Sequence, residues 1–458
     1  MSTHQNFPQP PLPASSSPSQ HGARFIRGRA TRTIGALSVA SLALGLAACG
    51  GGDEQSGGVS EAASDEEVEL TLWLQRDEFA PTDSFEAFEE EHENITVNTV
   101  TIPAEEQVSS FLRSSAAGDT PDVLMPTTDL WPALAEQEGA LYDMTSLLET
   151  WEEEDPEGYE AASAGIRFGT AQDGSTYGVG ISGAPTWTLY RKDWFEEAGI
   201  EPPETYEELL EGAKTIKEEH PESTAFGLVG GRSASPASHF LTYFYRMGGT
   251  HENGVPQFDS EAGIALLEYY QDLVKEGLAH RDTLTWTTDQ TRGTFIEGQL
   301  GTVQMSQNLY PTVEESLTYD EEWAILPDIH REGAEDDLLM TYRAVTALVA
   351  GSTEHPYEAS LLVRYLAGEE YGVDLSKRYQ PSLNAAVQED EEYLDVAPWV
   401  PELADNMDAA EPLPANPNSI ELYEVIQDMK QEAIDNPDAD AAEIAANGQE
   451  ALDAIGSE

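Results

Sequence analysis

The chain has very few basic side chains. Its 458 residues include 22 Lys and Arg against 86 Asp and Glu, which gives a formal net charge of −64. Such an anion repels phosphate groups, so the composition excludes nucleic-acid binding and disfavours adsorption to anionic lipid. Lysine is the scarcest charged type, with only six. This composition is typical of proteins from hosts adapted to high salt, where ions screen the repulsion between carboxylates.

Cysteine is nearly absent too. Cys49 is the only one, so no disulfide can form within the chain and core packing alone must hold the fold. It ends the apolar run 34–48, whose last residues are Leu-Ala-Ala. Four arginines and no acid precede that run. This order is typical of a bacterial lipoprotein export signal, with chance placement of the cysteine as the alternative.

Long apolar runs are also missing. The run 34–48 is too short to cross roughly 30 Å of hydrocarbon as a permanent helix, so we predict cleavage before Cys49. Cleavage would make Cys49 a diacylated N-terminus, such as one bearing palmitate, that anchors the chain to the outer face of a membrane. Residues 1–48 are then a signal peptide with a disordered extension, and the Gly- and acid-rich residues 49–66 are a flexible tether. The mature chain would keep 18 basic and 86 acidic residues, a net charge of −68.

From residue 68 onward, strand and helix patterns alternate, which predicts an α/β fold. Thr205 followed by Glu208 predicts a capping box on one of the helices. We predict strands at 68–74, 95–102, 122–125, 300–305, 322–326 and 343–350, and a strand pair at 177–180 and 186–190. Helices are predicted at 84–92, 105–117, 130–137, 192–198, 205–219, 237–247, 260–276, 289–297, 356–367, 369–378, 419–434 and 440–455.

Four strings in order resemble the extracellular solute-binding proteins of carbohydrate ABC transporters, the family that includes maltodextrin-binding proteins. The first string spans residues 189–210 and reads LYRKDWFEEAGI at 189–200 followed by PPETYEELL at 202–210, with Arg191 where the family usually has asparagine. The other strings are PDVL at 121–124, FIEGQLG at 295–301 and STEHPYEASLLVRYL at 352–366. The resemblance covers roughly residues 68–455.

The resemblance implies a type II periplasmic-binding-protein-like fold, in which two α/β lobes close around a ligand by a hinge. The family's chain path places crossings near 181–185, 342–345 and 380–382. Lobe 1 would then comprise 67–181 plus 345–380, and lobe 2 would comprise 184–342 plus 383–458. It further implies a monomer that binds a sugar or oligosaccharide, makes and breaks no bond, uses no cofactor, and passes its ligand to ABC permease subunits.

A sugar pocket needs flat aromatic rings for C–H faces and carboxylate or amide groups for hydroxyls. Several candidates follow predicted strands or crossings, where open α/β sheets place ligands. The resemblance adds that Asp129 has the spacing of a sugar-binding aspartate and Trp286 that of a stacking tryptophan. The predicted ligand-binding set is Trp73, Arg76, Asp77, Asp129, Trp131, Trp187, Tyr190, Trp286, Asn308, Tyr310, Tyr342 and Arg343; core packing is the alternative for each aromatic. Trp151, Trp194 and Trp323 are read as packing residues.

Other signals are weaker. Residues 178–183 fit a dinucleotide-binding pattern, but a strand rather than a helix follows them. Residues 435–443 are acidic yet contain Pro437 and lack the glycine of a calcium loop, so we read them as a helix start. No metal-ligand or nucleophile-elbow motif occurs, which predicts no metal site. Two alternatives stay open: an exported glycoside hydrolase, and a same-fold receptor for a polyamine, phosphate ester or metal chelate.

Overall fold

The computed structural model describes residues 66–80, 84–171, 173–231, 234–334, 338–408, 410–414 and 416–456. These ranges belong to one compact unit, residues 57–458. The predicted signal peptide, Cys49 and all of the tether except residue 66 lie outside them. Within the described residues no helix is both long enough and apolar enough to span a bilayer.

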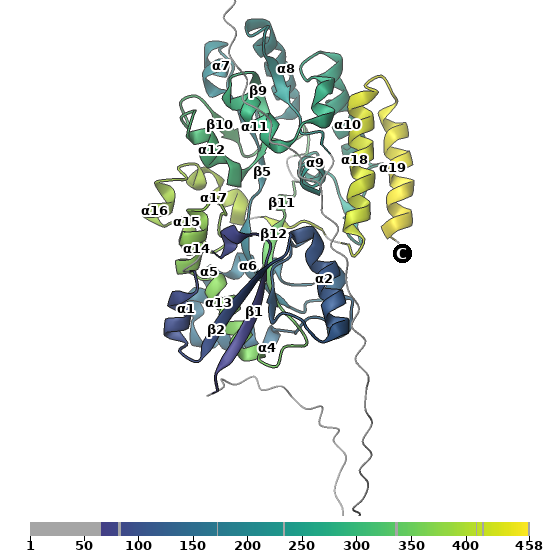
Figure 1. The fold of residues 1–458 in the computed structure, drawn as a ribbon. Coiled ribbons are helices and arrows are strands. Elements are labelled where there is room, and N and C mark those ends of the chain that lie inside the picture. Colours follow the sequence, from purple (N-terminus) through teal and green to yellow (C-terminus); the bar gives the residue numbers. More distant parts are fainter. Residues whose placement is uncertain are drawn as a thin grey trace, which may run out of the picture. The chain divides into compact units, whose positions relative to one another are not determined.

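The first sheet has the strand order β2-β1-β3-β12-β4 (Figure 1). The bounds are β1 Val68–Leu74, β2 Ile95–Thr101, β3 Val123–Leu124, β4 Gly178–Gly183 and β12 Ala344–Val349. Strands β1, β2 and β3 are parallel, whereas β12 runs antiparallel to both β3 and β4. Gly178 lets β4 approach β12 closely, because a Cβ there would lie 1.9 Å from the Ala347 carbonyl oxygen.

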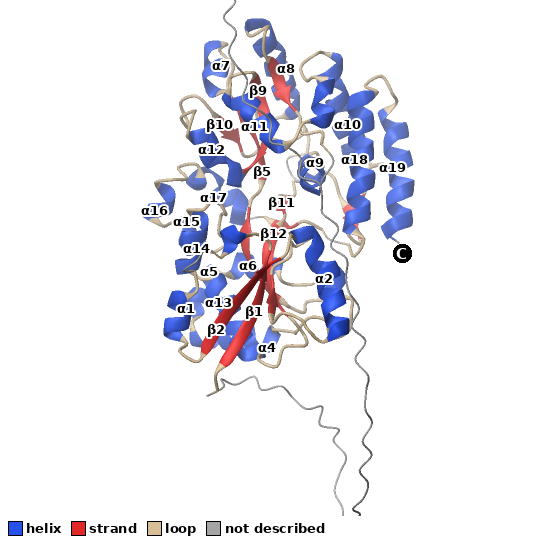
Figure 2. Cartoon of the chain, in the orientation of Figure 1, coloured by secondary structure: helices blue, strands red, loops and turns tan. Residues whose placement is uncertain are grey.

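Helices cover both faces of this sheet (Figure 2). One face packs on α1, α4, α13 and α14, and the other on α2 and α3. The bounds are α1 Glu86–Glu91, α2 Ala104–Ala117, α3 Pro132–Ala135, α4 Thr145–Glu154, α5 Pro156–Ala161, α6 Ser163–Phe168, α13 Pro356–Leu366 and α14 Glu369–Ser376. Helix α2 ends where Gly118 takes a positive φ of 73°, which glycine adopts without strain.

The second sheet has the order β10-β5-β9-β6. Its strands are β5 Thr186–Tyr190, β6 Thr224–Gly227, β9 Leu300–Ser306 and β10 Ala324–Leu326. The predicted pairing of the strands at 177–180 and 186–190 is therefore wrong: β4 pairs with β12, and β5 pairs with β9 and β10. Only Ala184 and Pro185 separate β4 from β5, and because the two strands belong to different sheets, the chain passes from one sheet to the other at these residues.

The helices beside the second sheet are α7 Lys192–Glu197, α8 Tyr206–Glu219, α9 Ala234–Arg246, α10 Glu261–Lys275, α11 Thr288–Ile296, α12 Tyr310–Glu314, α18 Ser419–Asp435 and α19 Ala441–Gly456. Figure 1 shows α18 and α19 side by side at the C-terminal end, where both contact α10. Helix α19 begins one residue after Asp440, whose Oδ1 accepts from the Ala442 amide at 2.9 Å, so the predicted helix start is confirmed.

The predicted capping box is only half correct. Thr205 does cap α8, since its hydroxyl accepts from the Glu208 amide at 3.2 Å. The Glu208 carboxylate, however, accepts from the Glu204 amide at 2.9 Å rather than from Thr205. A complete box occurs instead at α11, between Thr287 and Gln290.

The three segments predicted to cross between lobes lie next to one another. Gly183 pairs with Ala344, and Ser182 forms a bridge with Ser382. A further core beside these segments combines Phe168 and Ala344 with Trp187 and Val303. It also includes residues of α15 Ala385–Gln388, α16 Glu391–Leu394 and α17 Val400–Asp408. The lobe boundaries themselves stay a prediction.

The remaining strands form two small pairs. Strand β11 Thr341–Tyr342 lies parallel to β13 Glu411–Pro412, and β7 His251–Glu252 forms a hairpin with β8 Val255–Pro256. Three short 3-10 turns complete the described elements: η1 Asp77–Phe79, η2 Arg281–Thr285 and η3 Gln307–Leu309.

Candidate functional site

A buried polar cluster forms where β3 ends and β12 begins. The Arg343 Nε lies 2.8 Å from the Asp129 Oδ2, and the Asp129 side chain is fully buried. Arg343 also donates to the Thr127 hydroxyl at 3.1 Å. From α18, Tyr423 lies close enough to Asp129 for the carboxylate to act on its phenol. Burial, and next the Asp129 charge, hold the pKa of Tyr423 well above its usual value.

The backbone explains why Asp129 and Arg343 meet although 214 positions separate them. Thr128 donates its amide to the Ala344 carbonyl at 2.8 Å, and its hydroxyl accepts from the Ala344 amide at 3.0 Å. These bonds fix the loop after β3 against the start of β12, so the two flanking charges face each other. A buried carboxylate is tolerated only when paired, and here the Arg343 guanidinium supplies the counter-charge.

A cavity of about 1130 Å³ adjoins this cluster at Thr128, whereas Asp129, Arg343 and Tyr423 are not among the residues that line it. Trp131 and Tyr177 line it together with Thr128, and Asn253 of the β7–β8 turn and residues 411–414 around β13 also contribute to its wall. The Trp131 and Tyr177 rings meet edge to face with centroids 6.1 Å apart. Within the described residues, the buried Trp131 Nε1 has no hydrogen-bond partner. Rings beside amide and hydroxyl groups suit a solute with both apolar faces and hydroxyls.

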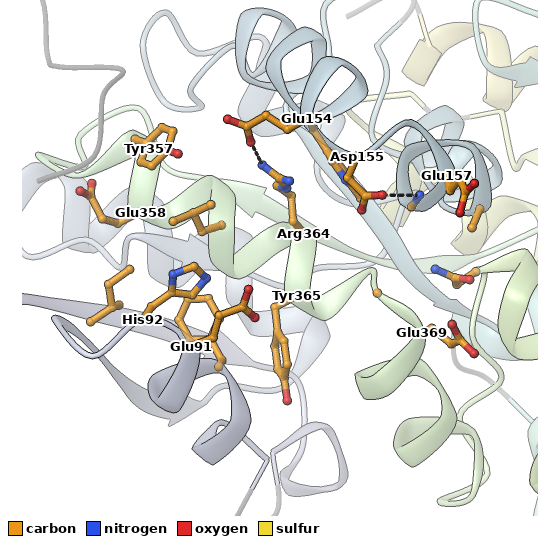
Figure 3. Close-up of a pocket in the computed structure, with 18 of the residues that line it drawn as sticks. Glu91, His92, Glu154, Asp155, Glu157, Tyr357, Glu358, Arg364, Tyr365 and Glu369 are labelled. Atoms are coloured by element: carbon orange, nitrogen blue, oxygen red, sulfur yellow. Dashed lines mark hydrogen bonds and ion pairs between the residues drawn. The ribbon is translucent and has the colours of Figure 1, made fainter.

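A second cavity, of about 810 Å³, lies against α1, α4 and α13 (Figure 3). Most of its charged residues are acidic, and Arg364 forms an ion pair with Glu154 at 2.8 Å. Asp155 accepts from the Gly158 amide at 3.0 Å and so caps α5. None of the predicted ligand-binding residues lines this cavity.

The predicted residues after β1 do not gather around the polar cluster. Trp73 is buried and packs edge to face on Phe111, with ring centroids 6.4 Å apart. Arg76 and Asp77 are exposed, and Asp77 accepts from the Thr101 hydroxyl at 2.7 Å. A role for these three in ligand binding stays a prediction.

The predicted aromatics of β5, α12 and β11 are core residues. Trp187, Tyr190, Tyr310 and Tyr342 are all buried in hydrophobic clusters. Burial raises the pKa of Tyr190 to about 12, with Glu402 adding to it. These placements favour packing, so contact of these four with a solute stays a prediction, as does that of the half-buried Asn308.

Trp286 is half-buried, unlike those aromatics, and its carbonyl accepts from the Gly231 amide at 3.0 Å. The three tryptophans read as packing residues are buried: Trp151, Trp194 and Trp323. Sequence reasoning missed Tyr423 and Thr127, because a tyrosine on the apolar face of a helix and a threonine in a loop carry no local signal of a shared site.

Lys430 of α18 is a buried cation near this region. Its Nζ donates to the Val229 carbonyl and lies 5.8 Å from the centre of the Phe240 ring. Burial lowers the pKa of Lys430 to about 7. Burial, and next the charges of Lys430 and Arg343, lower the pKa of the neighbouring His239 to about 3. His239 therefore stays neutral at ordinary pH.

The Lys430 pKa predicts a pH-dependent stability. Between pH 7 and 10.5 the unfolded chain binds this proton and the folded chain releases it, so the free energy of unfolding should rise with pH across that window. Denaturation of the wild type and of Lys430→Met at several pH values in constant salt measures this. The wild type should gain stability relative to the variant from pH 7 to 10, and parallel pH curves would contradict the expectation.

Comparison with known proteins gives a match over most of the described chain. The family model described as "Bacterial extracellular solute-binding protein" matches residues 77–373. A binding protein of Brucella abortus is 25% identical over 227 residues, which are 47% of this chain and 51% of the relative. The chain thus spans about half the length of the curated relatives it matches.

Solved structures match over a larger share. The maltose-bound MalE3 of T. maritima is 22% identical with a TM-score of 0.69, covering 85% of this chain and 100% of that one. The cyclic α-maltosyl-1,6-maltose binding protein of Arthrobacter globiformis is 20% identical, with a TM-score of 0.69 and coverages of 85% and 99%. UgpB of Mycobacterium tuberculosis, in complex with glycerophosphocholine, is 15% identical, with a TM-score of 0.68 and coverages of 86% and 98%. These likenesses confirm the predicted two-lobe α/β fold of the type II periplasmic binding proteins.

Proposed function

Because the chain belongs to the bacterial extracellular solute-binding proteins, the binding components of ABC transporters, we propose that its solute is a sugar or short oligosaccharide. It captures this ligand between its lobes and delivers it to the permease. Ligand stabilises the closed form because only that form contacts it from both sides. Binding involves no bond making or breaking.

The observation that carries this proposal is the cluster of Asp129, Arg343 and Tyr423. Carboxylate, guanidinium and phenol are hydrogen-bonding partners for hydroxyl groups. Since Arg343 neutralises Asp129, the cluster has no net charge and favours an uncharged, polyhydroxylated guest over an anion. The neighbouring Trp131 and Tyr177 rings supply apolar surface of the kind that sugar C–H faces pack on.

Structural neighbours support the sugar but also a second candidate. MalE3 holds maltose and the Arthrobacter protein is named for a cyclic maltosyl-maltose, whereas UgpB holds glycerophosphocholine. A receptor for a small phosphodiester or another non-sugar solute is therefore the alternative. The paired Asp129 disfavours it, because an anionic headgroup would meet a carboxylate as well as the guanidinium.

The proposal also includes the location of the protein, which is the outer face of the membrane. Cleavage before Cys49 and its acylation would hold a monomeric receptor at the outer face of the membrane, near its permease. The acidic composition, with a net charge of −64, supports a host that lives in high salt. Metabolic labelling with palmitate, compared between wild type and Cys49→Ala, tests the anchor.

A thermal-shift screen tests the ligand. Saccharides, polyols and glycerophosphocholine are added to the soluble body, residues 57–458, in molar salt. A ligand at a hundred times its Kd adds about 2.7 kcal/mol to the free energy of unfolding. Stabilisation by saccharides alone supports the proposal. Stabilisation by glycerophosphocholine alone favours the alternative, and new reducing ends after long incubation with oligosaccharides would indicate a hydrolase instead.

Trp286→Ala should strongly reduce the saccharide-dependent shift at a fixed ligand concentration, because a stacked ring contributes much of a sugar site's contact area. The ligand-free melting temperature should change little, since the side chain is half-buried. The same screen measures both. A full shift in the variant would place the stacking ring elsewhere.

A further inference from the structure

We infer that Lys430 is a positioning residue for the solute site: it holds the loop Val229 to Gly231, and through that loop it holds Trp286 in place for the ligand. This inference rests on the proposed function. Lys430 itself is buried in α18 and needs no contact with the solute.

One side of this loop is fixed by α18. Lys430 Nζ donates to the Val229 carbonyl, and the next residue, Gln431, donates its Nε2 to the Gly230 carbonyl at 2.9 Å. Two adjacent side chains thus hold two adjacent carbonyls. A carbonyl in such a loop has no strand partner, so a lost donor would leave it unpaired and free to turn.

The other side of the loop is fixed by the segment that carries Trp286. The Gly230 amide donates to the Thr283 carbonyl, and the Gly231 amide to the Trp286 carbonyl, both at 3.0 Å. The two backbones are in close approach, because a Cβ on Gly230 would lie 2.3 Å from the Thr283 oxygen and one on Gly231 would lie 2.9 Å from the Trp286 oxygen. The loop therefore cannot shift without moving Trp286.

The lysine is placed where packing alone would favour an apolar side chain. It lies among aromatic and aliphatic residues, 5.8 Å from the Phe240 ring centre. Burial in these surroundings opposes its protonation and lowers its pKa. Burying an amine here costs stability that methionine would not cost, so its use lies in the bond to Val229.

The first test needs no ligand. Backbone hydrogen exchange is measured on the wild type and on Lys430→Met, Gln431→Leu and the control Lys275→Met, an α10 lysine that pairs with Asp272 on its own helix. We expect Gly230 and Gly231 to exchange at least about tenfold faster in the first two variants and unchanged in the control. Unchanged exchange in Lys430→Met would overturn the inference.

The second test is a double-mutant cycle with Trp286→Ala, using maltose as the probe and the saccharide of largest shift beside it. Lys430→Met should weaken saccharide binding about tenfold when Trp286 is present. It should cause no further loss when Trp286 is already alanine, because the lysine acts through that ring. Additive losses would overturn the inference even where exchange increases. If the wild type binds no saccharide, the proposed function is wrong, and so is the role of Lys430 in ligand binding. The hydrogen-exchange result would still show whether Lys430 holds the loop at residues 229–231.

Discussion

Asp129→Ala is expected to lower the free energy of unfolding by about 3 kcal/mol and to abolish solute binding. The substitution leaves the Arg343 guanidinium, whose side chain is only 17% exposed, without its counter-charge. Removing one partner of a buried pair costs about 3 to 5 kcal/mol. Partial access of water to Arg343 favours the lower end. Urea denaturation in constant high salt measures the stability.

Two control variants distinguish the effect of losing an ion pair from the effect of leaving a charge buried. Glu154→Ala removes an ion pair of the same length, 2.8 Å, whose carboxylate is 49% exposed, and it should cost at most about 1 kcal/mol. The double variant Asp129→Ala with Arg343→Met should recover part of the stability, since no lone charge stays buried, but it should still fail to bind. If Asp129→Ala were as mild as Glu154→Ala, the cluster would not be the paired, buried unit described above.

Trp323→Ala should destabilise the second sheet's side by about 3 to 5 kcal/mol. The side chain is fully buried, and its ring lies 5.5 Å from that of Tyr310 and 5.7 Å from that of Trp399. Its Nε1 donates to the Leu317 carbonyl at 3.0 Å, so the substitution opens a cavity and also leaves that carbonyl without this donor. Calorimetry and denaturant unfolding of the ligand-free protein measure the loss.

Trp286→Ala is the matched control, because it removes the same atoms from a half-buried site. We expect Trp286→Ala to lower the ligand-free stability much less than Trp323→Ala does. For solute binding we expect the reverse: under conditions in which both variants are folded, Trp286→Ala should weaken binding more than Trp323→Ala. Equal stability losses would mean that Trp286 is part of the core and would remove the case for it as a ligand residue.

The local sequence pattern was sufficient to predict most helices and strands. The alternation in 68–74 became β1, the run 105–117 became α2 within one residue, and Thr205 capped α8 as expected. Such features depend on neighbours a few positions away, which the sequence displays directly. Helices α4, α5 and α6 were not predicted. Helices α5 and α6 have only six residues each, whereas α4 does space its buried Leu147, Leu148 and Trp151 as a helix would and was overlooked.

The candidate site could be predicted only in part, because its residues lie far apart in the sequence. Asp129 and Arg343 were each predicted as ligand residues, yet nothing in the sequence indicated that they would neutralise each other. Their meeting depends on bonds between Thr128 and Ala344, 216 positions apart. Tyr423 and Lys430 were read as ordinary helix positions, because their partners lie in loops far away along the chain.

The sequence by itself determined the charge of this protein, its α/β class and its resemblance to a family, because composition, period and short motifs are properties of consecutive residues. Tertiary structure alone decided that β4 and β5 lie in separate sheets, that six of the predicted ligand aromatics are buried in hydrophobic clusters, and that Asp129 is paired. Each of these depends on which distant segments exclude water from one another, and burial of that kind is settled only when the whole chain has packed.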